Sequence, residues 1–171
     1  MLFKNFILNK GINIIFIWAG LIVSIFYTSC SPGKVLPSAG NSEIAGAINT
    51  DKWIFTVDQV RPQSGRSRAA NGHYDVVFKR DTVTVYLPYF GRSYGTAGIL
   101  NNNPLDFKTT NFNFNKVQGK RGAWLVTIQP KDNNDVQSLA FTLYDNGSAQ
   151  LDVLMTNRSP ISFSGSLHVQ K

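Results

Sequence analysis

The stretch "LAFTLYDNGSAQLDVLM", residues 139–155, decides the fold class of this chain. Apolar residues occupy every second position in its first half and again from Ala149 to Met155. This period of two is typical of a strand that turns one face to the core and the other to water. Asn146-Gly147, between the halves, is typical of a type I′ hairpin turn, which needs a positive φ at both residues. The stretch therefore predicts two neighbouring antiparallel strands.

The same alternation recurs along most of the chain after residue 52. Helical periodicity is confined to residues 41–48, NSEIAGAI, just before the first alternating run. The further strands expected from the pattern are residues 53–57, 74–78, 83–87, 112–114, 124–128 and 161–169. Strands joined by short turns predict an all-β antiparallel meander with a short N-terminal helix before its first strand. The pattern is compatible with either a small barrel or a β-sandwich.

The first thirty residues have the layout of an export signal. Lys4 and Lys10 precede an uncharged apolar run, residues 11–27, that ends shortly before Cys30. The letters YTSC resemble a bacterial lipobox, in which the chain is cut before a cysteine that carries a lipid. They depart from that pattern at Tyr27, where an aliphatic residue is usual. We therefore expect a signal peptide over 1–29, lipidation at Cys30, a flexible tether over 30–44 and a single β domain over 45–171.

An uncleaved anchor helix is the alternative for this N-terminal segment, because an apolar run of about 17 residues is close to a short membrane span. Either outcome places the domain outside the cytoplasm. Ser31 follows Cys30, where an aspartate would resemble an inner-membrane retention signal, and no acidic run that would resemble a surface-export signal follows. We expect a cell-envelope protein, anchored in the outer membrane by its lipid and facing the periplasm.

Composition and charge limit the classes of partner. The chain has 171 residues, 43% of them hydrophobic, which suffices for one well-filled core. Without residues 1–29 it has 15 basic and 10 acidic residues, a net charge of +5. Its arginines and lysines fall mostly in turn-like stretches with no nucleic-acid-binding motif around them. We expect no nucleic-acid partner and only weak attraction to anionic lipid headgroups.

Several motifs occur in an order that resembles a known family. They are YxVxF at 74–78, VxVYLPYFGR at 83–92, WxVxI at 124–128, NGxAxLxV at 146–153 and NRSxIxFxG at 157–165. Together they resemble an uncharacterised family of secreted Gram-negative lipoprotein domains, a domain of unknown function. The resemblance covers residues 45–170, and the co-occurrence of LPYFG with NRS is its most specific part. It implies an all-β envelope lipoprotein and brings no activity with it.

The letters GRSYG, residues 91–95, match the GxSxG pattern of a hydrolase nucleophile elbow. An elbow needs a helix directly after the serine, but the following residues are rich in turn formers. Asp152 and His168, which would complete a triad with Ser93, fall on outward positions of their strands. We expect no enzyme activity, and a serine hydrolase using Ser93 remains the alternative. With two distant histidines and one cysteine, we expect no metal and no cofactor.

The LPYFG stretch has an expected structural role and a possible functional one. Pro88 is expected to end the strand, Tyr89 and Phe90 to fold over the open end of the core, and Gly91 to adopt a positive φ. Aromatic rings beside a guanidinium also suit sugars, peptides and lipid headgroups. The expected partner is an unknown envelope protein, glycan or lipid. The residues expected to bind it are Tyr86, Tyr89, Phe90, Arg92 and Tyr94.

Overall fold

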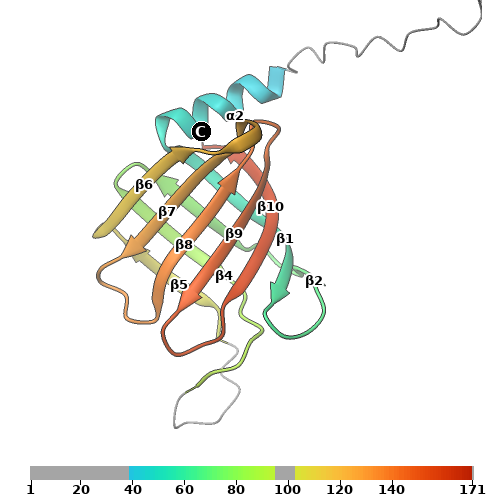
Figure 1. Ribbon diagram of the computed structural model, residues 1–171, viewed down its shortest axis with the longest axis vertical. Coiled ribbons are helices and arrows are strands. Elements are labelled where there is room, and N and C mark those ends of the chain that lie inside the picture. Colours follow the sequence, from blue (N-terminus) through green and yellow to red (C-terminus); the bar gives the residue numbers. More distant parts are fainter. Residues whose placement is uncertain (1–38, 95–102, 171) are drawn as a thin grey trace, which may run out of the picture. The chain divides into compact units, whose positions relative to one another are not determined.

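A computed structural model describes residues 39–94 and 103–170 of the chain. These residues form one helix, α2, a single 3-10 turn, η2, and a ten-stranded antiparallel sheet (Figure 1). The expected signal peptide and Cys30 lie outside the described residues. The elements are α2 (Ala39–Thr50), β1 (Lys52–Pro62), β2 (Arg68–Ala69), β3 (Asp75–Lys79), β4 (Thr82–Leu87), β5 (Leu105–Thr109), β6 (Phe112–Gln118), η2 (Lys120–Gly122), β7 (Trp124–Pro130), β8 (Val136–Leu143), β9 (Ser148–Met155) and β10 (Ile161–Val169).

The sheet is a nearly closed barrel, which decides between the two architectures expected from the sequence. Its strand order is β5-β4-β3-β1-β10-β9-β8-β7-β6, and short β2 pairs with β1 outside this path. Pairing of β1 with β10 joins the first and last long strands, with Trp53 opposite Val169 and Pro62 opposite Ile161. The strands curve around one interior in Figure 1. The edge strands β5 and β6 flank the opening of the barrel.

The core is the inward half of the alternating pattern. Trp53 on β1 packs its ring 5.1 Å from that of Phe78 and 5.0 Å from that of Phe141, so rings from three strands meet at the centre. Each inward residue of β4, β8 and β9 that the sequence pattern selected is buried. On edge strand β6 the pattern is weaker: Phe114 is 38% exposed, although its ring stacks on Phe78. An edge strand has a neighbour on one side only, which leaves this side chain partly uncovered.

The hairpin between β8 and β9 exists, but the expected type I′ turn is wrong. Gly147 has φ +84°, whereas Asn146 is absent from the positive-φ residues of the described chain. The amide of Gly147 donates to the carbonyl of Tyr144, and the amide of Tyr144 donates to Ser148. These bonds close a three-residue loop in which a single residue, the glycine, is left-handed. The Asn146 side chain accepts a hydrogen bond from the amide of Ser148 at 3.0 Å, which stabilises this three-residue loop.

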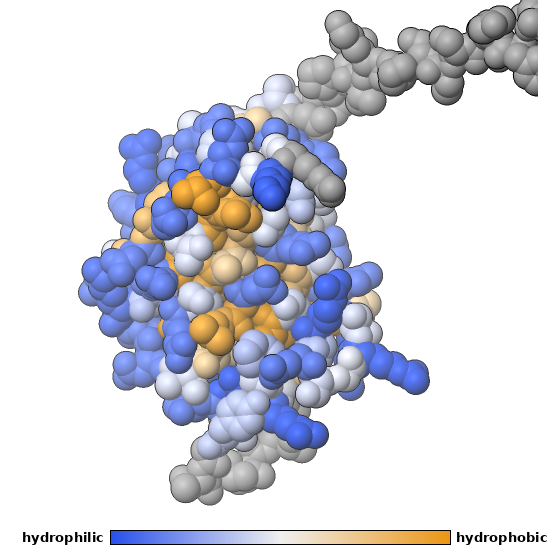
Figure 2. All heavy atoms as spheres, in the orientation of Figure 1, coloured by the Kyte–Doolittle hydropathy of each residue, from blue (hydrophilic) through white to orange (hydrophobic). Residues whose placement is uncertain are grey.

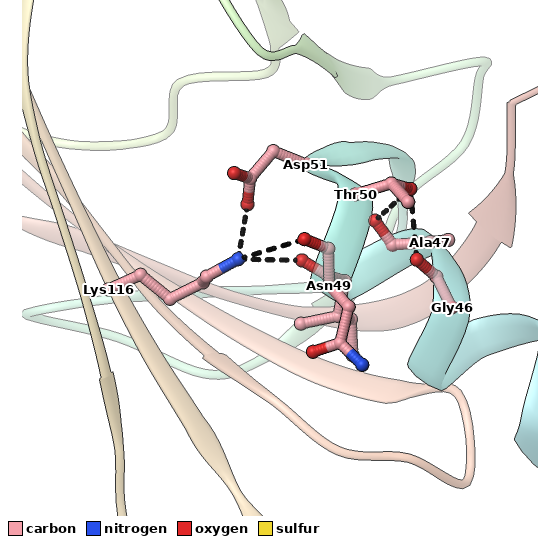
Figure 3. A network of polar contacts seen from close by, with 7 residues as sticks. Gly46, Ala47, Asn49, Thr50, Asp51 and Lys116 are labelled. Atoms are coloured by element: carbon pink, nitrogen blue, oxygen red, sulfur yellow. Dashed lines mark hydrogen bonds and ion pairs between the residues drawn. The ribbon is translucent and has the colours of Figure 1, made fainter.

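Helix α2 packs on β1 and β10 and buries Ile48 completely. It begins at Ala39, so it includes residues 39–44, the last part of the segment expected to be a tether. Its C-terminal end is fastened to β6 by Lys116, whose ammonium lies 2.6 Å from a carboxylate oxygen of Asp51 and donates to the carbonyl of Ile48 at 3.0 Å (Figure 3). A cation beside the last helical carbonyls is favourable because these atoms carry partial negative charge. In the described part of the chain, no helix is long and apolar enough to cross a membrane.

Candidate ligand site at the loop end of the barrel

Two loops distant in sequence dock on each other at the end of the barrel away from α2. One follows β4 and contains the LPYFGRS letters; the other joins β9 to β10 and contains NRS. The amide of Tyr94 donates to the carbonyl of Asn157 at 2.8 Å, and the amide of Ser159 donates to the carbonyl of Arg92 at 2.8 Å. Ser93 and Arg158 form an antiparallel bridge between these bonds. The two most specific motifs of the sequence therefore form one structural unit.

Tyr89 holds this unit together from inside. Its side chain is 1% exposed, and its hydroxyl lies 3.0 Å from the carbonyl of Arg92, 3.2 Å from that of Ser159 and 3.1 Å from Ser159 Oγ. The guanidinium of Arg158 lies 5.1 Å from the centre of its ring. Tyr89 and Phe90 were both expected to fold over the open end of the core, but only Tyr89 is buried there, and Phe90 is 36% exposed. Since Tyr89 is buried, it supports the candidate site from below and offers no surface to a ligand.

Gly91 is needed for space, and the expected positive φ is wrong. It is absent from the positive-φ glycines of the described chain. A Cβ at this position would lie 2.5 Å from Tyr89 Cζ and 2.7 Å from Ser159 Oγ. These distances are far inside van der Waals contact. Glycine therefore lets the backbone lie directly against the Tyr89–Ser159 hydrogen bond.

A pocket of about 250 Å³ opens beside this docked pair of loops. Its wall comes from three segments of the chain that are far apart in sequence. The guanidinium of Arg68, from β2, lies 5.6 Å from the centre of the Phe90 ring, which is within the range of a cation–π contact. The residues that line the pocket are Ser64, Arg68, Phe90, Gly91, Arg92 and Ser159.

The charges around the pocket are of one sign. Arg68 and Arg92 both line it and are exposed, and no acidic residue does. Within residues 39–94 and 103–170, ion pairs join Lys116 to Asp51 and Arg158 to Asp135, and neither pocket arginine forms one. Ser159 Oγ is already engaged, because it accepts from the amide of Arg92 at 3.0 Å. The pocket is therefore a small positive hollow with a rigid floor and an aromatic wall.

The residues expected to form the binding surface separate into three groups. Phe90 and Arg92 come together in the pocket. Tyr86, 40% exposed on β4, stacks its ring on that of Tyr74 at 5.4 Å and is not among the pocket-lining residues. Tyr94 is 66% exposed beside the bridge to Arg158. Sequence reasoning missed Ser64, Arg68 and Ser159, although the NRS motif contains one of them.

Ser93 is not surrounded by the groups that a nucleophile requires. Its Oγ is buried, and no partner for it occurs among the described residues. His168 lies opposite Ile54 near the α2 end of β10, seven residues from Ile161, which is roughly 23 Å along a strand. Asp152 is exposed and accepts a hydrogen bond from Ser162. The three residues of the formal triad are therefore not brought together.

Other surfaces of the described chain offer weaker candidates. Val117 and Leu125 are exposed register partners on β6 and β7. On the face over β7–β9, polar side chains divide the apolar surface into small areas (Figure 2). No group of three or more His, Cys, Asp or Glu side chains in residues 39–94 and 103–170 could hold a metal ion. The pocket at the loop end differs from these surfaces in combining two arginines without ion pairs and an aromatic ring.

Comparisons with known proteins agree with the fold and name no activity. A family model described as a domain of unknown function, DUF4251, matches residues 38–167. The crystal structure of a DUF4251 family protein from Bacteroides eggerthii DSM 20697 is similar, with a TM-score of 0.59 and 17% identity; the match covers 76% of this chain and 87% of that one. No protein with a curated description matches. The expected resemblance to a domain of unknown function is confirmed at this level.

Proposed function

This chain belongs to the DUF4251 family, and we propose that it is a lipid-anchored envelope protein whose β barrel binds an envelope partner or ligand without catalysis. The observation that carries the binding role is the pocket at the loop end, lined by Arg68, Phe90 and Arg92. Its exposed guanidiniums and ring stand on a floor fixed by the buried Tyr89 hydrogen bonds. A rigid base under exposed arginine and aromatic side chains is typical of a recognition site.

The proposed anchor fits the position of the pocket. If Cys30 carries the lipid, residues 31–38 separate it from α2, and they span at most roughly 30 Å when extended. Because α2 packs near the start of β1 and the pocket lies near the end of that strand, α2 and the pocket lie at opposite ends of the barrel.

The proposal assigns no catalytic role to Ser93. Its buried oxygen has no acceptor or donor among the described residues, and His168 lies near the opposite end of β10. A serine nucleophile needs a base within hydrogen-bond reach. We therefore expect a fluorophosphonate probe to leave the purified protein unlabelled. Labelling at Ser93 would replace the binding role with the hydrolase alternative.

Capture from an envelope extract tests the binding role. The full chain would be immobilised as the wild type, Phe90→Ala, Arg92→Gln and the control Arg66→Gln. Arg66 lies in the same loop as Ser64 and is exposed but does not line the pocket. We expect the wild type and the control to retain the same envelope component, and the two pocket variants to lose most of it at unchanged melting temperature. Equal retention by all four proteins would contradict binding at this pocket.

Metabolic labelling with a fatty-acid probe tests the anchor. The wild type should be labelled and should partition into detergent, whereas Cys30→Ala should be unlabelled. A wild type that is unlabelled but stays in the membrane fraction would instead support the uncleaved anchor helix.

A further inference from the structure

We infer that the pocket at the loop end takes an oxyanion, a carboxylate or phosphate group of a small ligand, held between Arg68 and Arg92. This inference rests on the proposed binding role and adds the chemical class of the ligand. It also adds Arg68, from the other side of the pocket, to the residues that recognise the ligand.

The positive charge of the pocket is uncompensated. Arg68 and Arg92 both line this hollow of about 250 Å³, so two positively charged residues belong to one small pocket. Neither has an ion-pair partner among the described residues, and no acid lines the pocket. The two like charges raise each other's free energy. An anion between them would remove this repulsion and gain charge-assisted hydrogen bonds from both.

The side chain of Arg68 and the backbone of Arg92 are held in place. Arg68 belongs to β2, which pairs with β1 at Val60, and its guanidinium is packed over the Phe90 ring. Two hydrogen bonds to Ser159 fix the backbone of Arg92. The amide of Arg92 donates to Ser159 Oγ at 3.0 Å, and the amide of Ser159 donates to the carbonyl of Arg92 at 2.8 Å. Positioned donors lose less conformational entropy when they bind a ligand. Solvated arginines of a surface turn lack such supports.

The size of the pocket and its remaining walls limit the ligand to a small group. At about 250 Å³ the pocket is below the roughly 300–1,000 Å³ of drug-sized sites, so it would admit one charged group and the few atoms attached to it. Ser64 supplies one further hydroxyl, and the partly exposed Phe90 ring supplies an apolar wall for those atoms. A carboxylate and a phosphate share the same recognition by guanidinium forks, and the choice between them belongs to the experiment.

The experiment is calorimetric titration of the detergent-solubilised full chain with matched charged and neutral probes. Glucuronate is compared with glucose, glycerol 3-phosphate with glycerol, and inorganic phosphate is titrated alone. We expect at least one anionic probe to bind about tenfold or more tightly than its neutral partner, with affinity falling as salt rises. The preferred pair identifies a carboxylate or a phosphate source. Equal affinity for charged and neutral probes, or no binding of any anion, would overturn the inference.

Variants separate this inference from the proposed function. Arg68→Gln and Arg92→Gln should each weaken binding of the anionic probe by about tenfold. Arg66→Gln changes the net charge equally and should leave the affinity unchanged. An equal loss in all three variants would show attraction by net charge alone and would overturn the site. If Phe90→Ala abolishes envelope capture while no anion binds, the binding role stands and the oxyanion inference falls. If anions bind at the pocket but envelope capture does not depend on it, the proposed function falls instead.

Discussion

The hydroxyl of Tyr89 is the atom on which the geometry of the candidate site depends most. It lies within 3.2 Å of three oxygen atoms of Arg92 and Ser159. The two contacts to Ser159 join loops 70 residues apart in sequence, and the contact to Arg92 lies within one loop. Removing this buried hydroxyl takes a hydrogen bond away from its partners, and water cannot reach them to replace it. The ring itself fills the end of the core, so a phenylalanine would keep the packing. This separates the hydrogen bonds from the hydrophobic contribution.

We therefore expect Tyr89→Phe to lower the free energy of unfolding by about 1–3 kcal/mol. Urea denaturation followed by tryptophan fluorescence would measure it. The control is Tyr86→Phe, which removes an exposed hydroxyl and should change stability by less than about 0.5 kcal/mol. Equal stability of the two variants would show that the Tyr89 hydroxyl does not couple the loops.

A substitution at Gly91 tests how closely the backbone lies against Tyr89 and Ser159, because Gly91 has no positive φ that would add backbone strain. An alanine Cβ would collide with Tyr89 Cζ and Ser159 Oγ, and both side chains are held by hydrogen bonds. We expect Gly91→Ala to cost about 1–3 kcal/mol, as overpacking of a filled site does. Gly46→Ala in α2 is the matched control, because a Cβ there meets nothing within 4 Å. This control should stabilise the protein by up to about 1 kcal/mol through helix propensity. Thermal melts in which both variants behave alike would contradict the predicted contact.

At the scale of elements, Lys116 is the contact through which edge strand β6 holds helix α2. Its side chain and that of Asp51 are 18% and 22% exposed, so their ion pair is partly shielded from water. The same ammonium also donates to the carbonyl of Ile48. These contacts join residues 65 or more positions apart, between β6 and the C-terminal end of α2.

Lys116→Met is expected to destabilise the protein by about 1–2 kcal/mol and to increase amide exchange in α2. The comparison variant is Lys108→Met on the other edge strand, where the lysine is exposed and forms no ion pair in the described chain. It should leave α2 unchanged. If hydrogen exchange in α2 is the same in both variants, the helix is held by its apolar contacts alone.

The strands themselves could be predicted from the sequence because alternation is a local property. The turn at Gly147 was placed correctly, but its type was not, since the Asn146 side chain bonds to Ser148 and favours a different loop. Barrel closure was open at the sequence level because it depends on which strands pair across the chain, as β1 and β10 do. Local patterns carry little information on such pairing.

The candidate site shows the same limit at the scale of the whole molecule. Phe90 and Arg92 could be selected as exposed recognition residues from their own stretch. Arg68 could not, because its place beside them follows from the pairing of β2 with β1. Tyr89 and Phe90 were both expected to cover the end of the core and both expected to bind, because the alternation stops at Pro88 and nothing local fixes which ring turns inward; in the structure Tyr89 is buried and Phe90 is exposed. A pocket formed by three distant segments becomes visible once the fold is known.

The central claim is that the loop end of the barrel is the surface with which this protein binds its partner. Hydrogen exchange of the full chain, measured by mass spectrometry with and without the envelope fraction that it retains, tests this claim most directly. We expect protection to increase in the peptides covering residues 62–68 and 89–94, which contain Arg68, Phe90 and Arg92, and α2 and β6 to stay unchanged. Protection confined to β6 and β7, or no change at the loop end while material is retained, would contradict it.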